Sequence, residues 1–273
     1  GSGPGLPGRR TAIGGPVTRN GSSGMNRIVV VGNGIAGLTA CDSLRTAGYD
    51  GELTVVGAER HQPYSRPALS KALLNSGAEG NDDGGLSAHE LPAPSHGAAE
   101  LLGIGAAGLD VEARIVRLDD GTELPYDGLV IASGSRAKHL APVGSGESVV
   151  GHDVGRDAGT GEPRALTLRT FEDAVELRRR LQERPSVIVV GAGALGMEVA
   201  SSCLQAGCGV TLVSDAPPLS RQLGGYLSDV FTSAAARRGL QLISGTRARL
   251  LGGPVSGVVL DDGTELHAGL VVS

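Results

Sequence analysis

The sequence predicts an α/β protein in which one architecture is built twice, and three features carry that prediction. A strand, a glycine loop and a helix follow one another at RIVVVGNGIAG and again at SVIVVGAGALG. The heptapeptide LDDGTEL occurs at 118–124 and at 260–266, and each copy precedes a Gly-Leu-Val strand. A chain of 273 residues is also long enough for two domains, each with its own core.

The first half alternates strands and helices in the order that a parallel sheet needs. Residues 1–24 are mostly Gly, Pro and Ser, and we expect a flexible tail or a linker left by cloning. A strand (RIVVVG), a helix (IAGLTACDSLRTAG) and a strand (GELTVVGAE) follow. The polar interval 75–97 predicts loop, and LDVEARIVRLDDGTELPYDGLVIAS predicts an antiparallel meander that returns to a buried strand.

The second half repeats this order after a Gly-rich loop at 144–164. RTFEDAVELRRRLQERP predicts an amphipathic helix with acidic residues early and basic residues late, ended by Pro185. Next come a strand (SVIVVG), a helix (ALGMEVASSCLQAG), a strand (GVTLVSD), a helix (LSDVFTSAAARRG), short strands, LDDGTEL and the strand LVVS. LDDGTEL by itself is also compatible with chance or with a favoured hairpin, because Asp-Gly is a strong turn signal.

Composition excludes several classes of protein. The formal net charge of −5 leaves no basic footprint for nucleic acid or an anionic membrane, and no apolar run reaches membrane-spanning length. Cys41, Cys203 and Cys208 are too few for a disulfide scaffold and match no zinc spacing, so we expect a reducing, cytoplasmic location. The six histidines are scattered without ligand spacing, and we expect no metal site.

Each half opens with a G-x-G-x-x-G loop between a strand and a helix. The first glycine permits the tight turn, the second lets the backbone approach a pyrophosphate, and the third lets the helix pack closely on the strand. The alternative is a pair of tight turns in an inert scaffold. We therefore expect an α/β fold with two Rossmann-like ββα dinucleotide-binding domains, each with a parallel sheet, helices and an antiparallel β-meander. The glycines are Gly32, Gly34 and Gly37 in the first loop and Gly191, Gly193 and Gly196 in the second.

An acidic residue stands near the end of the second strand in each half. Glu59 is a natural acceptor for ribose hydroxyls, and its alternative is an ordinary solvated glutamate. Asp215 follows Ser214 at the matching place in the second half, where the binding and the structural interpretations stay equally open.

Five stretches together resemble the pyridine nucleotide-disulfide oxidoreductase superfamily, specifically its FAD-dependent ferredoxin, rubredoxin and putidaredoxin reductase branch. The resemblance covers 25–273, and its most specific stretch is PYSRPALSK at 63–71. The stretches are GNGIAG with Glu59, PYSRPALSK, LVIASGS at 129–135, LRTFEDA at 168–174 and GAGALGME at 191–198.

For the first half, the resemblance implies an FAD-binding domain at 25–143. The first glycine loop and Glu59 would hold the FAD pyrophosphate and adenosine ribose, Arg66 would lie by the phosphates, and Lys71 would face the flavin. Arg66 and Lys71 are otherwise ordinary surface charges. Ala132, Ser133 and Gly134 match the Ala-Thr-Gly strand end of the family, with Ser in place of Thr.

For the second half, the resemblance implies an NAD(P)H-binding domain at 165–273. The second glycine loop and Asp215 would hold the nicotinamide cofactor, and Glu198 would lie where nicotinamide meets flavin, paired with Lys71 as the second catalytic residue. Glu198 is otherwise a glutamate stabilised by its helix dipole. NADH-preferring members carry Glu where this chain has Ser214, which leaves NADPH open. We expect NADH because the adjacent Asp215 could still accept from the ribose 2′-hydroxyl and repel a 2′-phosphate.

The implied activity is that of a flavoprotein oxidoreductase, an enzyme that transfers hydride from NAD(P)H to FAD. PYSRPALSKALL contains no redox cysteine, so electrons would leave the flavin directly for a ferredoxin- or rubredoxin-like carrier. The alternatives are an NAD(P)H oxidase, a quinone reductase, the flavin module of a nitrite reductase, or a non-catalytic nucleotide-binding remnant. The family continues past LVVS with a Gly-Asp segment and an interface domain, so we expect these 273 residues alone to hold FAD weakly unless another chain completes the site.

Overall fold

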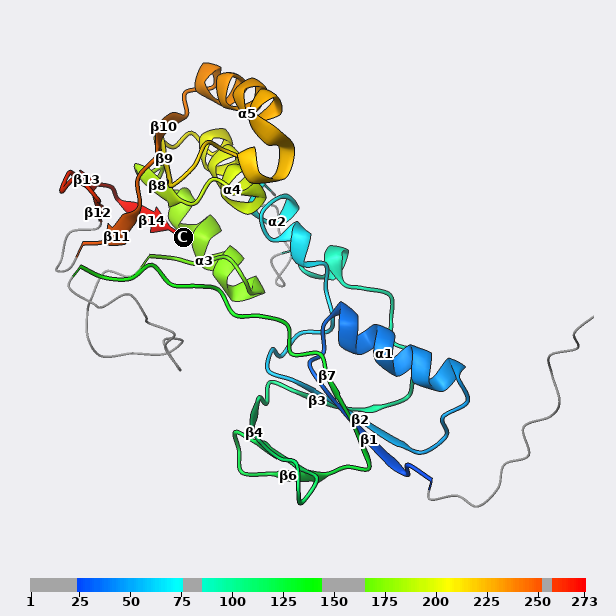
Figure 1. Cartoon of the computed structure of the whole chain (residues 1–273). Coiled ribbons are helices and arrows are strands. Elements are labelled where there is room, and N and C mark those ends of the chain that lie inside the picture. The colour runs from blue at the N-terminus through cyan, green and yellow to red at the C-terminus, as the bar shows by residue number, and fades with distance from the viewer. Residues whose placement is uncertain (1–23, 76–84, 144–164, 252–256) are drawn as a thin grey trace, which may run out of the picture.

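The computed structural model describes residues 24–75, 85–143, 165–251 and 257–273 (Figure 1). The expected tail, up to residue 23, and the expected Gly-rich loop at 144–164 lie outside the described residues. So does the middle of the polar interval, at 76–84.

The first half is a parallel sheet in the order β3-β2-β1-β7, with a separate antiparallel meander β4-β5-β6. Cys41 and Leu44 of α1 pack on one face of the sheet, and Val116 and Leu118 of β5 pack on the other. The elements are β1 (Arg27–Val31), α1 (Ile35–Thr46), β2 (Glu52–Gly57), the short helices η1 (Arg66–Ala68), α2 (Ala72–Asn75) and η2 (Ser87–His89), β3 (Ala99–Leu102), β4 (Ala106–Asp110), β5 (Ile115–Leu118), β6 (Glu123–Pro125) and β7 (Gly128–Ile131).

The second half repeats this plan, with a parallel sheet β10-β9-β8-β14 and a meander β11-β12-β13. Each sheet places the third, second, first and last strands of its own half side by side, and only the helix α3 lies outside this repeat in the described residues of the second half. The predicted fold class and internal duplication are therefore confirmed. The elements are α3 (Phe171–Leu181), β8 (Val187–Val190), α4 (Ala194–Gln205), β9 (Val210–Ser214), α5 (Ser220–Arg237), β10 (Gln241–Ser244), β11 (Ala248–Leu250), β12 (Gly257–Leu260), β13 (Glu265–His267) and β14 (Leu270–Val272).

One predicted helix was too short. The sequence predicts a helix that starts at LSDVF, whereas α5 already begins at Ser220. The chain is helical on both sides of Gly224, which has φ 75° and marks a kink between two helical pieces. The pair Gly224 and Gly225 weakens the helix pattern, because glycine has a low helix propensity, and this hid the first piece.

The repeated heptapeptide makes the same hairpin in both meanders. The Leu118 amide donates to the Thr122 carbonyl at 2.8 Å, and the Leu260 amide donates to the Thr264 carbonyl at 2.9 Å. Asp119 Oδ2 accepts from the Gly105 amide at 3.0 Å, and Asp261 Oδ2 accepts from the Arg247 amide at 2.9 Å. The repeat is therefore structural, since each copy closes its own hairpin and ties it to the preceding strand.

The stretch 63–75 belongs to the first half in sequence but packs in the core of the second. Leu69, Leu73 and Leu74 share one cluster with Phe171 of α3 and Val199 of α4. Figure 1 shows α2 beside α4, away from the first-half sheet. Burial of three leucines contributes about 1.5–3 kcal/mol each, so this apolar contact joins the two halves.

Within the described ranges, no helix is long and apolar enough to cross a membrane.

The hairpins yield a stability prediction. Gly121 and Gly263 have φ of 88° and 84°, where a side chain is strained. We expect Gly263→Ala to lower the free energy of unfolding by about 1 kcal/mol, and Gly263→Asn to lower it less, because Asn tolerates this region better. Denaturant unfolding measures both, and an unchanged midpoint in the Ala variant would contradict the assigned turn geometry.

Candidate functional site

Both glycine loops bring a helix into direct backbone contact with a strand end. A Cβ on Gly37 would lie 1.8 Å from the Gly32 carbonyl oxygen, and a Cβ on Gly196 would lie 1.8 Å from the Gly191 carbonyl oxygen. Gly32 and Gly191 themselves have φ of 115° and 104°. No other residue fits the third position in either loop without displacing the backbone.

The helices that follow the loops begin without side-chain caps. Gly34 caps α1 and Gly193 caps α4, and neither offers a side-chain hydrogen bond to the first turn. In contrast, α3 carries a full capping box made by Thr170 and Asp173. A Cβ on Gly34 would meet nothing within 4 Å, so the space before α1 is open. Uncapped amides that face open space are suited to phosphate.

The strand end after β7 lies against the first glycine loop. A Cβ on Gly32 would lie 2.1 Å from the carbonyl oxygen of Ala132, and Gly134 has φ 69°. Ser133 is exposed beside this contact. Asn33, inside the loop, has a buried Nδ2 with no hydrogen-bond partner among the described residues. The predicted residues Ala132 and Ser133 therefore lie at the loop, whereas a Cβ on Gly134 would lie 3.1 Å from Arg169 Nη2.

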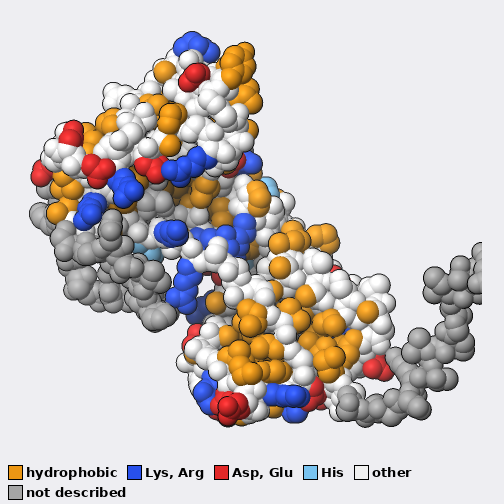
Figure 2. Space-filling view, in the orientation of Figure 1, with side chains coloured by type: hydrophobic (Ala, Val, Ile, Leu, Met, Phe, Trp, Pro, Cys, Tyr) orange, Lys and Arg blue, Asp and Glu red, His pale blue; other side chains and the backbone are white. Residues whose placement is uncertain are grey.

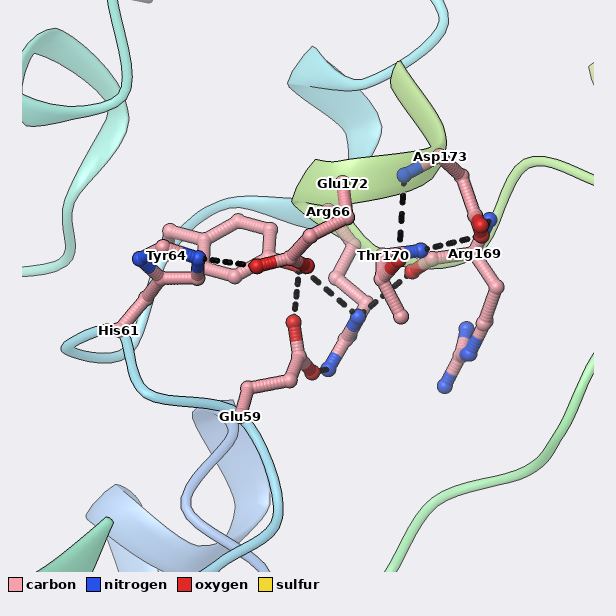
Figure 3. A network of polar contacts seen from close by, with 8 residues as sticks. All are labelled: Glu59, His61, Tyr64, Arg66, Arg169, Thr170, Glu172 and Asp173. Atoms are coloured by element: carbon pink, nitrogen blue, oxygen red, sulfur yellow. Dashed lines mark hydrogen bonds and ion pairs between the residues drawn. The ribbon is translucent and has the colours of Figure 1, made fainter. Parts of the chain in front are cut away.

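Glu59 and Arg66, which the resemblance gives separate roles, form an ion pair (Figure 3). The Tyr64 hydroxyl donates to the other oxygen of Glu59 at 2.5 Å. Arg66 Nη1 also donates to the Arg169 carbonyl oxygen at 2.6 Å, so the guanidinium reaches the second half. Sequence reasoning missed Tyr64 and Arg169, although both lie in the stretches that carry the resemblance, because their partners are set only by the fold.

Two further contacts strengthen this network. His61 Nε2 lies 2.6 Å from Glu172 Oε1, and the His61 ring packs edge-on against Phe171. Burial acts to raise the pKa of Glu172, but the hydrogen bonds to its carboxylate, the largest from His61, together with the His61 charge outweigh burial, so the pKa is lowered. Burial, followed by the hydrogen bond to Glu59, raises the pKa of Tyr64, so its hydroxyl remains a donor at neutral pH.

Lys71 and Glu198 meet at the boundary between the halves. Lys71 Nζ lies 3.2 Å from Glu198 Oε1, and the Ser70 hydroxyl donates to Glu198 Oε2 at 2.5 Å. Figure 2 shows Lys and Arg side chains gathered where the two halves meet, on the face in view. Positive charge at a boundary between two glycine loops favours anionic ligands there.

Two hollows flank Gly193 in the second half. One is lined by Ser214, Asp215, Arg221 and Gln222, and Arg221 Nη2 donates to Asp215 Oδ2 at 2.9 Å. The other has a volume of about 300 Å³ and a largely apolar lining that includes Leu168, Val189 and Leu195. A ligand that lies across Gly193 would therefore contact polar residues beside Asp215 at one end and apolar residues beside α4 at the other.

The three cysteines are buried and offer no reactive thiol at this site. All three are buried and free, and burial, helped by the Asp42 carboxylate, raises the pKa of Cys41 to about 11. Burial likewise raises the pKa of Cys203 to about 12 and raises that of Cys208. In the part of the chain that the structure describes, no group of His, Cys, Asp and Glu could hold a metal ion.

Comparison with known proteins now assigns the family. The protein family described as "Pyridine nucleotide-disulphide oxidoreductase" matches residues 26–273 of this chain. The chain belongs to this family. Membership implies FAD and a pyridine nucleotide as cofactors, in agreement with the two glycine loops.

The similar proteins include ferredoxin and rubredoxin reductases, as the resemblance implies. The "Anthranilate 1,2-dioxygenase system ferredoxin--NAD(+) reductase component" of Burkholderia cepacia is 37% identical over 89% of this chain and 57% of its own length. "Rhodocoxin reductase" of Rhodococcus erythropolis is 33% identical over 90% of this chain and 54% of its own length. The chain thus spans about half the length of the curated relatives it matches.

A solved structure agrees with this fold. The ferredoxin reductase for the CYP199A2 system from Rhodopseudomonas palustris has a TM-score of 0.74 and 31% identity, over 90% of this chain and 58% of that one.

Cysteine burial predicts low thiol reactivity. We expect Cys41, Cys203 and Cys208 to react with a disulfide reagent at least about 100-fold more slowly in the folded chain than in denaturant, because buried thiols with raised pKa carry almost no thiolate. A colorimetric thiol titration measures this. One thiol that reacts at the denatured rate would overturn the assigned burial.

Proposed function

We propose that the protein is a flavoprotein oxidoreductase that takes hydride from NAD(P)H onto FAD and passes electrons to a small iron–sulfur carrier of the ferredoxin or rubredoxin type. The observation that carries the proposal is the Lys71–Glu198 contact between two halves that each hold a dinucleotide loop. The names of the similar proteins support the acceptor class. With all three cysteines buried, electrons leave the flavin without a disulfide.

FAD fits residues 25–143. The uncapped amides before α1, the open space at Gly34 and the orphan amide of Asn33 supply donors and room for a pyrophosphate. Glu59 takes the ribose hydroxyls, for which its carboxylate keeps acceptor capacity beside Tyr64 and Arg66. Arg66 is the cation of the same network and is proposed to lie by the phosphates.

NAD(P)H fits residues 165–273. The second glycine loop takes the pyrophosphate, Asp215 takes the adenosine ribose, and the apolar hollow takes the nicotinamide end. NADH is the preferred form, because the carboxylate of Asp215 repels a 2′-phosphate and holds Arg221, the nearby cation that would otherwise bind it.

Lys71 and Glu198 are the proposed catalytic residues. FAD, when bound, supplies the centre that accepts hydride and releases single electrons. The Lys71 ammonium would stabilise negative charge on a bound flavin electrostatically, and the Glu198 carboxylate, 3.2 Å away, would orient that ammonium.

Reduction with labelled NADH tests the function. The chain, supplied with FAD under anaerobic conditions, should lose its visible flavin absorption on addition of NADH, and more slowly with deuterium at the transferred position of C4. An oxidised ferredoxin or rubredoxin should then restore the absorption faster than a quinone or oxygen does. Bleaching without a carrier response would favour an oxidase or quinone reductase, and no bleaching at FAD concentrations that saturate the chain would refute the proposal.

The open space at Gly34 gives a prediction about FAD. We expect Gly34→Ala to weaken FAD binding about 10- to 100-fold through lost backbone hydrogen bonds to phosphate, while the fold is unchanged. The matched variant Gly37→Ala should instead destabilise the fold by about 1–3 kcal/mol or more. Fluorescence titration and thermal unfolding separate the effects; equal FAD affinity in Gly34→Ala would rule out phosphate at this position.

The Asp215–Arg221 pair gives a prediction about cofactor choice. We expect Asp215→Asn to shift the NADH:NADPH preference toward NADPH by about tenfold, because the carboxylate is neutralised and Arg221 is released. The shift should disappear in Asp215→Asn/Arg221→Gln. Steady-state kcat/KM values for both cofactors measure it, and an unshifted ratio would show that Asp215 does not face the ribose.

A further inference from the structure

Ser70 and Lys71, consecutive residues of the first half, contact the two carboxylate oxygens of Glu198 in the second half. The Ser70 hydroxyl donates to Glu198 Oε2 at 2.5 Å, and Lys71 Nζ lies 3.2 Å from Glu198 Oε1. Ser70 is only 2% exposed, whereas the Lys71 side chain is 57% exposed. The same carboxylate therefore has one buried donor and one solvated donor.

Ser70 has a second contact with α4. The Ser202 hydroxyl donates to the Ser70 carbonyl oxygen at 3.1 Å, and Ser202 is 5% exposed. Glu198 and Ser202 are four residues apart and lie on one face of the helix. Ser70 thus donates to one residue of this face and accepts from the other, in an apolar setting that Leu69 and Cys203 share.

The strengths of the two contacts to Glu198 differ. An ion pair with a half-exposed lysine contributes little, because water screens it and a long side chain must be immobilised. A buried hydroxyl that donates to a carboxylate is a short, charge-assisted bond with strict geometry. The orientation of Glu198 therefore depends on Ser70 more than on Lys71.

We infer that Ser70 is a positioning residue, whose hydroxyl fixes the Glu198 carboxylate and through it the Lys71 ammonium at the boundary between the two halves. The inference rests on the proposed function for its consequence, which is that nicotinamide and flavin meet in the geometry that hydride transfer needs. A variant that lacks the hydroxyl keeps its carbonyl, and so keeps the bond from Ser202.

A thermal cycle without cofactor tests the contact. We expect Ser70→Ala to lower Tm by about 3–6 °C when Glu198 is present and by less than about 1 °C in a Glu198→Ala background. Ser202→Ala, the matched control, should lower Tm equally in both backgrounds. An equal effect of Ser70→Ala in both backgrounds would overturn the inference.

Transient kinetics on the FAD-loaded chain test the consequence. We expect Ser70→Ala to slow flavin reduction at saturating NADH by about 10- to 100-fold, with the half-saturating NADH concentration changed less than about twofold. Ser202→Ala, which also removes one bond between the halves, should reduce flavin at nearly the unsubstituted rate. Normal reduction in Ser70→Ala, or equal slowing in both variants, would overturn positioning by Ser70. If NADH reduces no flavin in the unsubstituted chain, the proposed function fails, and the thermal cycle still decides whether Ser70 holds Glu198.

Discussion

The backbone contact inside each glycine loop is the constraint on which the rest of the structure depends. Gly37 and Gly196 let their helices approach the Gly32 and Gly191 carbonyl oxygens so closely that no Cβ fits. This approach starts each helix directly at the edge of a sheet, where its first amides face open space instead of a capping side chain. Because the neighbouring parallel strands end at the same edge, Glu59 and Asp215 lie near the loops. One steric requirement thus creates the proposed phosphate-binding position and places its acidic neighbour.

The second requirement is that two such units face each other, and apolar packing meets it. Leu69, Leu73 and Leu74 of the first half are buried against α3 and α4 of the second. This burial carries Ser70 and Lys71 to Glu198, and the network of Glu59, Tyr64 and Arg66 reaches the Arg169 carbonyl from the other side. The polar contacts at the boundary set its geometry, while each buried leucine contributes about 1.5–3 kcal/mol to the free energy of folding. Stability and site geometry therefore come from different side chains of one short segment.

Much of this was predictable from sequence, because strong local patterns and an internal repeat agreed. The order of strands and helices along the chain, both meanders and the Lys71–Glu198 pair follow from periodicity, turn signals and the resemblance. The pairing of Arg66 with Glu59 was not predictable, since an arginine that is suited to phosphate is equally suited to a carboxylate. Its contact with Arg169 uses a backbone carbonyl 103 residues away, which no side-chain pattern reports. Likewise, the leucines of 69–74 indicate burial but not in which core, and the kink at Gly224 concealed the start of α5.

The central claim is that the duplicated units hold two different dinucleotides in one chain at the same time. Equilibrium dialysis of the chain with labelled FAD and NAD⁺, separately and together, tests it most directly. At saturating concentrations, the account predicts one FAD and one NAD⁺ per chain, with neither displacing the other, and loss of the NAD⁺ site alone in Gly193→Ala. A total of one dinucleotide per chain, with FAD and NAD⁺ in competition for it, would contradict the account.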